Sequence, residues 1–330
     1  MLVLAKAMLA VMIGFISSVI CGLIIIPFLR KIKAKQKVSI FLEKTHKKKD
    51  GTPTMGGLIF IIPTIFTVLL LLATNKLEMT YNLGITIFVF IAYAVLGFID
   101  DYLIIKRHSN EGLTEIQKLF GQVVIAIVFF ILYIKGGNPT SIEITVLNIS
   151  INLKWAYSFF ILFLLVASSN AVNITDGLDG LAGGLSAIAF LAFGLMAWAS
   201  TYMLGNQDIA VFCFILLGSL LGFLVFNTYP ARVFMGDTGS LSLGATLASI
   251  AILTSHEITF IVVAGIFIIE TLSSLVQMIS VRFFNKKILL MAPLHHHFEK
   301  MGYHERDIVK AYWVIGLILA MAGILYSVWI

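Results

Sequence analysis

The stretch AMLAVMIGFISSVICGLIIIPFL, residues 7–29, contains no charged residue. A helix of about 20 apolar residues crosses the roughly 30 Å of hydrocarbon in a bilayer. The whole chain has the same character: its 330 residues are 59% hydrophobic and only 12% charged, with a mean hydropathy of +1.00. A soluble domain cannot bury this much apolar surface, so the sequence predicts an integral membrane protein.

Comparable apolar runs recur along the chain. They are expected to be helices, because lipid offers no hydrogen-bond partner to an open backbone, whereas a β-barrel would show weaker alternating stretches. We therefore expect an all-α polytopic membrane protein with one integral membrane domain over residues 1–330. The ten predicted spans are Ala7–Leu29, Met55–Thr74, Asn82–Ile99, Leu119–Ile134, Ala156–Ala171, Leu181–Leu204, Ile209–Phe226, Leu241–Leu253, Ile258–Ser280 and Ala311–Ile330.

The basic residues orient these spans. Nine of the 23 lysines and arginines lie between Arg30 and Lys49, and six lie between Arg282 and Lys310, both in odd-numbered loops. The even-numbered loops hold only Lys76, Lys135 and Lys154. Positively charged loops stay in the cytoplasm, so the odd loops are predicted to be cytoplasmic and both termini extracytoplasmic.

One predicted outer loop has internal periodicity. The sequence SIEITVLNISINLKW, residues 141–155, alternates apolar and polar side chains, with Leu147 and Asn148 near its middle. Alternation with a period of two is typical of a strand. We predict a small external β-hairpin there.

Chemically versatile residues gather on the predicted cytoplasmic face. The segments that carry them are KKKDGTPTMGG (47–57), FIDDYL (98–103), NAVNITDGLDGLAGG (170–184), NTYPARVFMGDTGS (227–240) and APLHHHFEKMGYHERD (292–307). Five aspartates stand at span ends on this face: Asp100, Asp101, Asp176, Asp179 and Asp237. A carboxylate at a membrane boundary is costly unless it is solvated, paired or bound to a cation, so their convergence indicates a shared site.

The residue types in these segments favour phosphoryl transfer. Carboxylates near glycine-rich turns hold Mg²⁺ together with substrate phosphates, and glycines let a phosphate approach the backbone. The lysines at 47–49 offset phosphate charge, and histidine contacts phosphate or transfers protons near neutral pH. In such reactions, positioning and charge neutralisation supply most of the catalysis.

Each of these features also has a simpler explanation. Asp100 and Asp101 fit a solvated helix end, and the lysine run fits a topology signal. His295, His296 and His297 point in different directions if they lie on a helix, so we do not expect them to bind one metal ion. These simpler explanations do not account for the placement of all the features on one face. Glu270, inside the ninth span, either pairs with another helix or marks a pathway.

In combination, the motifs GTPTMGG, DD, NAVNITDGLDGLA, NTYPARVFMGDTGS and MAPLHHHFE resemble the phospho-N-acetylmuramoyl-pentapeptide-transferase family over essentially the whole chain. The wider superfamily of polyprenyl-phosphate sugar-1-phosphate transferases is similar through DD, NxxDGxDG and GD. The form PLHHHFE resembles the muramoyl-pentapeptide branch.

The resemblance implies an enzyme, a phosphotransferase of the bacterial cytoplasmic membrane with its active site on the cytoplasmic face. Its substrates would be UDP-N-acetylmuramoyl-pentapeptide and undecaprenyl phosphate, its products the lipid-linked peptidoglycan precursor and UMP, and its cofactor Mg²⁺. The resemblance also implies a homodimer and inhibition by uridine-based nucleosides; no nucleic-acid partner is expected. A phosphate monoester is largely ionised at neutral pH, its second pKa being about 6, which favours direct attack over a route through a phospho-sugar on an aspartate.

The resemblance also assigns roles to residues. Asp237 is implied to bind Mg²⁺, Asp100, Asp101 and His295 to be catalytic with it, and His297 to be structural. The implied substrate-binding residues are Lys49, Thr54, Asn173, Asp176, Gly177, Leu178, Asp179, Asn227, Phe234, Gly236 and His296. The ninth span is expected to bend or break between Ile268 and Ser280, leaving an apolar groove for the isoprenyl chain.

Two other functions compete with this one. A sister enzyme would transfer N-acetylglucosamine-1-phosphate to the same lipid, and the PLHHHFE motif argues against it. A transporter would carry polar or broken helices near the middle of the membrane, often in two related halves. Here the polar residues gather at one face, and Glu270 is the exception.

Overall fold

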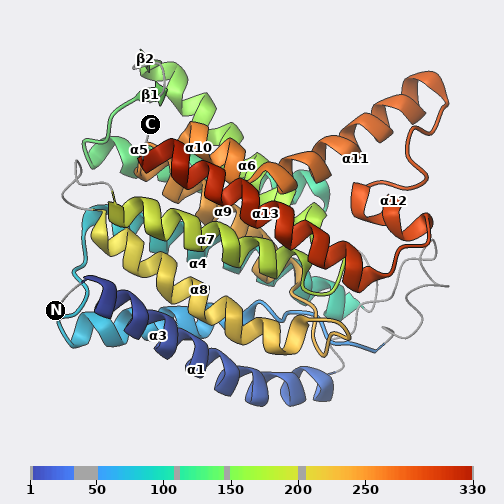
Figure 1. Cartoon of the computed structure of the whole chain (residues 1–330), viewed down its shortest axis with the longest axis horizontal. Helices are drawn as coiled ribbons and strands as arrows, with labels where there is room; N and C mark the ends of the chain where they lie inside the picture. The colour runs from blue at the N-terminus through green and yellow to red at the C-terminus, as the bar shows by residue number, and fades with distance from the viewer. Residues whose placement is uncertain (1–2, 33–50, 108–111, 145–148, 200–205, 329–330) are drawn as a thin grey trace.

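The computed structural model describes residues 3–32, 51–107, 112–144, 149–199 and 206–328, and within these ranges the chain is mainly helical (Figure 1). Lys49 lies outside the described residues. The long helices are α1 (Val3–Lys31), α3 (Leu58–Ala73), α4 (Tyr81–Arg107), α5 (Glu115–Lys135), α6 (Tyr157–Thr175), α7 (Leu181–Ala199), α8 (Gln207–Asn227), α9 (Gly236–Leu253), α11 (Gly265–Phe284) and α13 (Glu305–Val328). The short elements are β1 (Ser141–Ile144), β2 (Ile149–Asn152), η4 (Lys154–Ala156), α10 (Glu257–Val263) and α12 (Leu294–Lys300).

Nine of the ten predicted spans each overlap one α-helix, the ninth overlaps both α10 and α11, and the multi-pass membrane architecture is confirmed. Within the described ranges, 8 helices are long and apolar enough to cross a membrane. Helix α3 is shorter, with 16 residues. Helix α9 begins at Gly236 rather than at the predicted Leu241. The count of ten crossings and the side of each terminus stay predictions.

The centre of the molecule is formed by α7, α8 and α9. Helix α8 packs against α1, α3 and α7, and α9 packs against α4, α6 and α7. In Figure 1, α7, α8 and α13 run side by side across the body, α11 extends away from it, and the short helix α12 lies beside the start of α13. Helix α11 is much less buried than α8: 22% of its apolar stretch is buried inside the protein, against 83% for α8.

Helix α9 is buried along nearly its whole length although it carries many serines and threonines. Apart from Thr238, which donates to the Asp101 side chain, these residues donate their hydroxyls to backbone carbonyls. Ser242 Oγ donates to the Phe90 carbonyl at 2.8 Å, and Thr246 Oγ1 donates to the Ser242 carbonyl at 2.6 Å. Small side chains with satisfied hydroxyls let the neighbouring helices approach closely without leaving unpaired polar groups in an apolar environment.

The ninth predicted span is broken, but not at the predicted place. Helix α10 ends at Val263 and α11 begins at Gly265, whereas the expected break between Ile268 and Ser280 is wrong because α11 runs through it. The break coincides with a glycine, which weakens a helix. The polar residues further on lie within α11, where Thr271 Oγ1 donates to the Phe267 carbonyl at 2.8 Å and is not left unpaired.

The predicted β-hairpin is confirmed as an antiparallel pair. Strands β1 and β2 pair with Ser141 opposite Asn152 and Ile144 opposite Ile149. The predicted middle of the hairpin, at Leu147 and Asn148, lies outside the described residues. Its extracytoplasmic location stays a prediction.

Helices α4 and the start of α9 approach so closely that only glycine fits at residue 97. A Cβ atom on Gly97 would lie 2.1 Å from the carbonyl oxygen of Asp237. We predict that Gly97→Ala lowers the free energy of unfolding by about 1–3 kcal/mol, because backbone must move to admit the methyl group. The measurement is the midpoint of thermal unfolding in detergent. Gly84→Ala on the same helix is the matched control, since a Cβ there meets nothing within 4 Å; equal midpoints for the two variants would contradict this packing.

Candidate active site

Two loops that are far apart in sequence are joined by backbone hydrogen bonds. Gly56 N donates to the Phe234 carbonyl at 2.7 Å, and Phe234 N donates to the Pro53 carbonyl at 2.8 Å. This pairing brings Thr54 and Phe234, two predicted substrate-binding residues, to the start of α9. Phe234 is half-buried. Thr54 is only 1% exposed, and its hydroxyl has no hydrogen-bond partner among the described residues.

Asp101 is buried at the N-terminal end of α9. Its Oδ2 accepts hydrogen bonds from Thr238 N at 2.9 Å and Thr238 Oγ1 at 2.6 Å, and its Oδ1 accepts one from Asp237 N at 3.3 Å. The first N–H groups of a helix have no partner within it, and a carboxylate satisfies them while complementing the helix dipole. Both carboxylate oxygens of Asp101 are therefore engaged in holding α9 to α4.

Asp100 and Asp237 flank a lysine. Lys118 Nζ lies 3.3 Å from Asp100 Oδ1 and 2.5 Å from Asp237 Oδ2. Asn173 on α6 adds a hydrogen bond from Nδ2 to Asp237 Oδ1 at 2.7 Å. The Asp237 side chain is 20% exposed and that of Asp100 only 4%. Asp100, Asp237, Lys118 and Asn173, which we call the carboxylate cluster, thus come from four different helices.

Lys118 is not among the site residues that the sequence predicts. The signal was its place on the helix. Thr114 and Gln117 form a capping box at the start of α5, so Lys118 follows within the first helical turn. A cation is disfavoured by the helix dipole there. A lysine in that position indicates nearby negative charge, which Asp100 and Asp237 supply.

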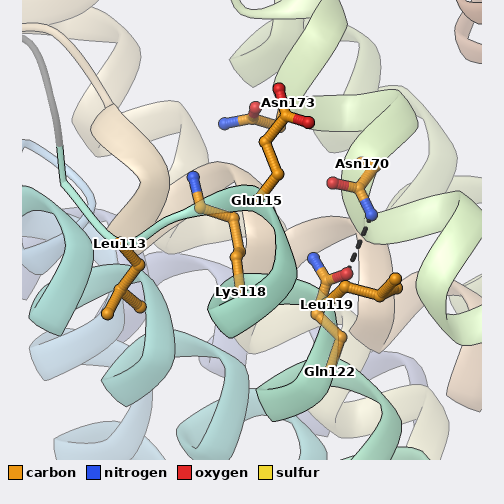
Figure 2. A pocket seen from close by; sticks show the side chains of 7 residues that line it. All are labelled: Leu113, Glu115, Lys118, Leu119, Gln122, Asn170 and Asn173. Atoms are coloured by element: carbon orange, nitrogen blue, oxygen red, sulfur yellow. Dashed lines mark hydrogen bonds between the residues drawn. The ribbon is translucent and has the colours of Figure 1, made fainter.

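A cavity of about 330 Å³ opens beside the carboxylate cluster (Figure 2). Its lining residues come from α5, α6 and the turn before α5: Leu113, Glu115, Lys118, Leu119, Gln122, Asn170 and Asn173. Asn170 Nδ2 donates to Gln122 Oε1 at 3.0 Å across the two helices, as drawn in Figure 2. The cavity is polar and gives a ligand access to the lysine and to Asn173.

The histidine triplet lies on α12, and each ring has its own Nδ1 contact. His295 Nδ1 lies 2.9 Å from Glu270 Oε2, and His296 Nδ1 lies 2.6 Å from Glu299 Oε2. His297 Nδ1 instead accepts a hydrogen bond from Leu290 N at 3.1 Å, which supports the loop before α12.

Gly177 packs against the first two histidines. A Cβ atom built on Gly177 would lie 2.3 Å from His295 Nε2 and 3.2 Å from His296 Nε2, so both Nε2 atoms face this glycine. Gly177 follows the end of α6, four positions after Asn173 of the carboxylate cluster. The end of α6 therefore joins the carboxylates on one side to the histidines on the other.

The remaining predicted residues lie around this junction. Asp176 is the C-terminal cap of α6, and Leu178 is buried. Asp179 accepts a hydrogen bond at Oδ2 from Ala231 N at 2.9 Å. Asn227, at the end of α8, donates from Nδ2 to the Val233 carbonyl at 3.0 Å. These contacts fix the 228–235 loop, while Gly236 begins α9.

The carboxylate cluster fits the way proteins hold Mg²⁺. Within the described ranges, no group of three or more histidine, cysteine or acidic side chains is placed to hold a metal ion. Mg²⁺ is usually bound through one or two carboxylates, with water and substrate phosphates completing its coordination. Asp237, partly exposed, and Asp100, across Lys118, provide such a pair.

Comparison with known proteins agrees with this arrangement. Residues 82–255, which contain α4 to α9, match the model of glycosyl transferase family 4. Residues 49–61 match signature 1 of the phospho-N-acetylmuramoyl-pentapeptide-transferases. The chain is 47% identical over 325 residues to the phospho-N-acetylmuramoyl-pentapeptide-transferase of Geobacillus sp. (strain WCH70), with 98% of each chain covered. It is 46% identical over 321 residues to that of Bacillus subtilis (strain 168), with 97% of each covered.

The fold and the carboxylate cluster thus define a multi-pass membrane transferase of the glycosyl transferase 4 class. Since the similarity extends over nearly the full length of its relatives and includes their signature, the chain belongs to the phospho-N-acetylmuramoyl-pentapeptide-transferase family.

The different hydrogen bonds of Asp101 and Asp237 predict that substituting these two residues changes the stability of the protein to different extents. Asp101→Asn should lower the free energy of unfolding by about 1–3 kcal/mol, because an amide cannot accept all three hydrogen bonds from α9. Asp237→Asn should change it by less than about 1 kcal/mol, because that side chain is partly exposed and its ion pair is screened. Thermal unfolding of the two purified variants measures the difference. A larger loss in Asp237→Asn than in Asp101→Asn would show that the cap has been misassigned.

Proposed function

We propose that this protein transfers phospho-N-acetylmuramoyl-pentapeptide from UDP-N-acetylmuramoyl-pentapeptide to undecaprenyl phosphate. The reaction gives a lipid-linked peptidoglycan precursor and UMP. The observation that carries the proposal is the carboxylate cluster, in which Asp100, Lys118 and Asp237 meet beside a polar cavity. A lysine and carboxylates that can bind a metal ion neutralise the charge of a diphosphate when they lie together. The identity of the substrates is inferred from the family.

Mg²⁺ is part of the proposal. Asp237, together with Asp100, would hold it against the diphosphate, and the ion would neutralise the charge that develops on the phosphate oxygens. Lys118 then contributes a fixed positive charge next to the same oxygens. Asn173 orients Asp237 through its hydrogen bond. Asp101 positions these groups by capping α9, and it serves catalysis through Asp237 and Thr238.

The nucleotide-sugar is proposed to occupy the junction at the end of α6. Phe234 offers a half-buried ring for stacking of the uracil base, and Gly177 lets the donor approach His295 and His296. Nucleoside inhibitors that contain uridine would compete there. Lys49 is proposed to contact the nucleotide from the preceding segment.

The lipid acceptor is proposed to lie in an apolar groove of about 410 Å³ between α6, α10 and α11. Its walls include Phe163 and Ala167 on α6, Ile261 on α10, and Ile268 and Leu275 on α11. The groove follows from the break at Ala264, because α11 departs from the bundle and leaves apolar side chains without a helix over them. An isoprenyl chain has the chemistry and the flexibility to fill such a surface.

The topology is proposed to follow the charge distribution. Ten crossings would place both termini outside the cytoplasm and the carboxylate cluster at the cytoplasmic face of the cell membrane, where the nucleotide substrate is made. Two copies of the chain are proposed to form a homodimer. For the chemistry, we favour direct attack of the ionised lipid phosphate on the sugar-linked phosphate, with one inversion at phosphorus.

The first test of the function is release of UMP by the purified protein with undecaprenyl phosphate and Mg²⁺. We expect UMP from UDP-N-acetylmuramoyl-pentapeptide and none from UDP-N-acetylglucosamine. Asp237→Asn and Lys118→Gln should each lower kcat by at least about 100-fold, since electrostatic stabilisation of the transition state supplies most of the rate. Release from N-acetylglucosamine instead would assign the protein to the sister reaction. No release from either nucleotide would refute the proposal.

The groove makes a separate prediction about the lipid. Ala167→Phe fills the groove from α6 and should raise KM for undecaprenyl phosphate by about 10-fold, equivalent to about 1.4 kcal/mol, without changing KM for the nucleotide. The same substitution at Ala73, an exposed residue at the end of α3, is the control. Steady-state kinetics at varied lipid concentration in mixed micelles gives both constants. An unchanged lipid KM in Ala167→Phe would place the acceptor elsewhere.

A further inference from the structure

Glu270 is a carboxylic acid buried in the middle of α11, with 0% of the residue exposed. Its Oε2 lies 2.9 Å from His295 Nδ1 and 3.4 Å from His295 N. His295 is likewise 0% exposed. A buried carboxylate that meets a buried histidine is an expensive arrangement, because both groups lose their hydration. A well-packed apolar pair would stabilise the fold at least as well. Folding alone therefore does not account for Glu270.

The contact fixes which ring nitrogen of His295 faces the active site. A carboxylate accepts but does not donate, so Nδ1 must carry a proton toward Glu270. Nε2 is then the atom left for another partner. It is buried, and it has no hydrogen-bond partner among the described residues. It points at Gly177, where an added Cβ would lie only 2.3 Å away.

We propose that Glu270 is a positioning residue for His295. Its carboxylate holds Nδ1–H and offsets the positive charge of the imidazolium, so that Nε2–H donates a hydrogen bond to a phosphate oxygen of the nucleotide-sugar. No proton needs to leave the ring during the reaction. The proposal rests on the proposed function, because the phosphate is that of its donor substrate. A partner that fixes the ring and the charge of a site histidine acts in the same way in other enzymes.

The variant Glu270→Gln tests this with little change in shape. Its amide oxygen still accepts Nδ1–H, but the negative charge is gone, so the ring becomes neutral and Nε2 presents a lone pair to the phosphate. We expect kcat for UMP release to fall by about 10-fold to 100-fold. KM for undecaprenyl phosphate should stay within about 3-fold of the native value, because the acceptor does not contact this pair. Glu143→Gln, the same chemical change at an exposed strand residue, should leave both constants unchanged.

A double-mutant cycle separates positioning from a structural role. His295→Asn keeps a donor near Glu270 and removes Nε2. If Glu270 acts through His295, Glu270→Gln should change kcat by less than about 2-fold in the His295→Asn background, although it costs at least about 10-fold in the native one. Loss of the same factor in both backgrounds would mean that Glu270 only supports the fold, and the proposal would be overturned.

A measurement on the native protein covers the case in which the variants do not fold. Nuclear magnetic resonance of histidine labelled with ¹⁵N in both ring nitrogens reports which nitrogen carries a proton. The signal of His295 is identified because it is missing in His295→Asn. If that variant does not fold, a paramagnetic substrate analogue identifies the signal by perturbing it. With the nucleotide-sugar bound, we expect both Nδ1 and Nε2 to carry a proton, and an Nε2 without one would overturn the proposal. An unprotonated Nδ1 would overturn the proposal even if the enzyme releases UMP. A protonated Nδ1 in a protein that releases no UMP would instead refute the proposed function and leave the Glu270–His295 contact standing.

Discussion

The site depends on one buried contact, in which the carboxylate of Asp101 receives three hydrogen bonds from the first turn of α9. Helix α9 lies in the interior, where water cannot satisfy its free N–H groups, so another helix must do so. The same contact fixes Asp237, because its own N–H is one of the donors. Neighbouring Asp100 is thereby presented to Lys118 from the opposite side. Two adjacent residues thus have different tasks: Asp101 caps α9, and Asp100 belongs to the carboxylate cluster.

The junction at the end of α6 combines two kinds of chemistry. Asn173 reaches Asp237, and Gly177 four positions later lies against His295 and His296. Carboxylates and lysine suit the metal ion and the charge of a diphosphate, whereas histidines held by glutamates present directed Nε2 atoms. A donor that carries both a diphosphate and a sugar can contact both parts of this junction, so both parts can position it for the proposed reaction.

Hydropathy predicted the helices, because runs such as Ala7–Leu29 have no stable alternative in lipid, and alternation predicted the hairpin at 141–155. The motifs located the segments that form the candidate site. Other features could not be predicted from the sequence, because they depend on tertiary contacts. Lys118 is significant only once α5 packs beside α4 and α9. Asp101 is adjacent to Asp100 in the sequence, but it contacts α9, whereas Asp100 contacts Lys118 on α5. The break in the ninth span was expected from the family resemblance between Ile268 and Ser280, whereas the structure places it at Ala264, next to Gly265.

Helix α11 borders both proposed substrate sites. Ile268 and Leu275 line the apolar groove, while Glu270, between them in sequence, holds the histidine of α12. Ser273 Oγ also accepts a hydrogen bond from Leu294 N at 3.0 Å, so α12 is attached to this helix at two points. Beyond the break at Ala264, α11 packs against α6 and α13, and α12 packs against α13 and against Gly177 at the end of α6. If the lipid occupies the groove as proposed, its binding and the binding of the donor at His295 are coupled through α11, and such a coupling acts equally in both directions.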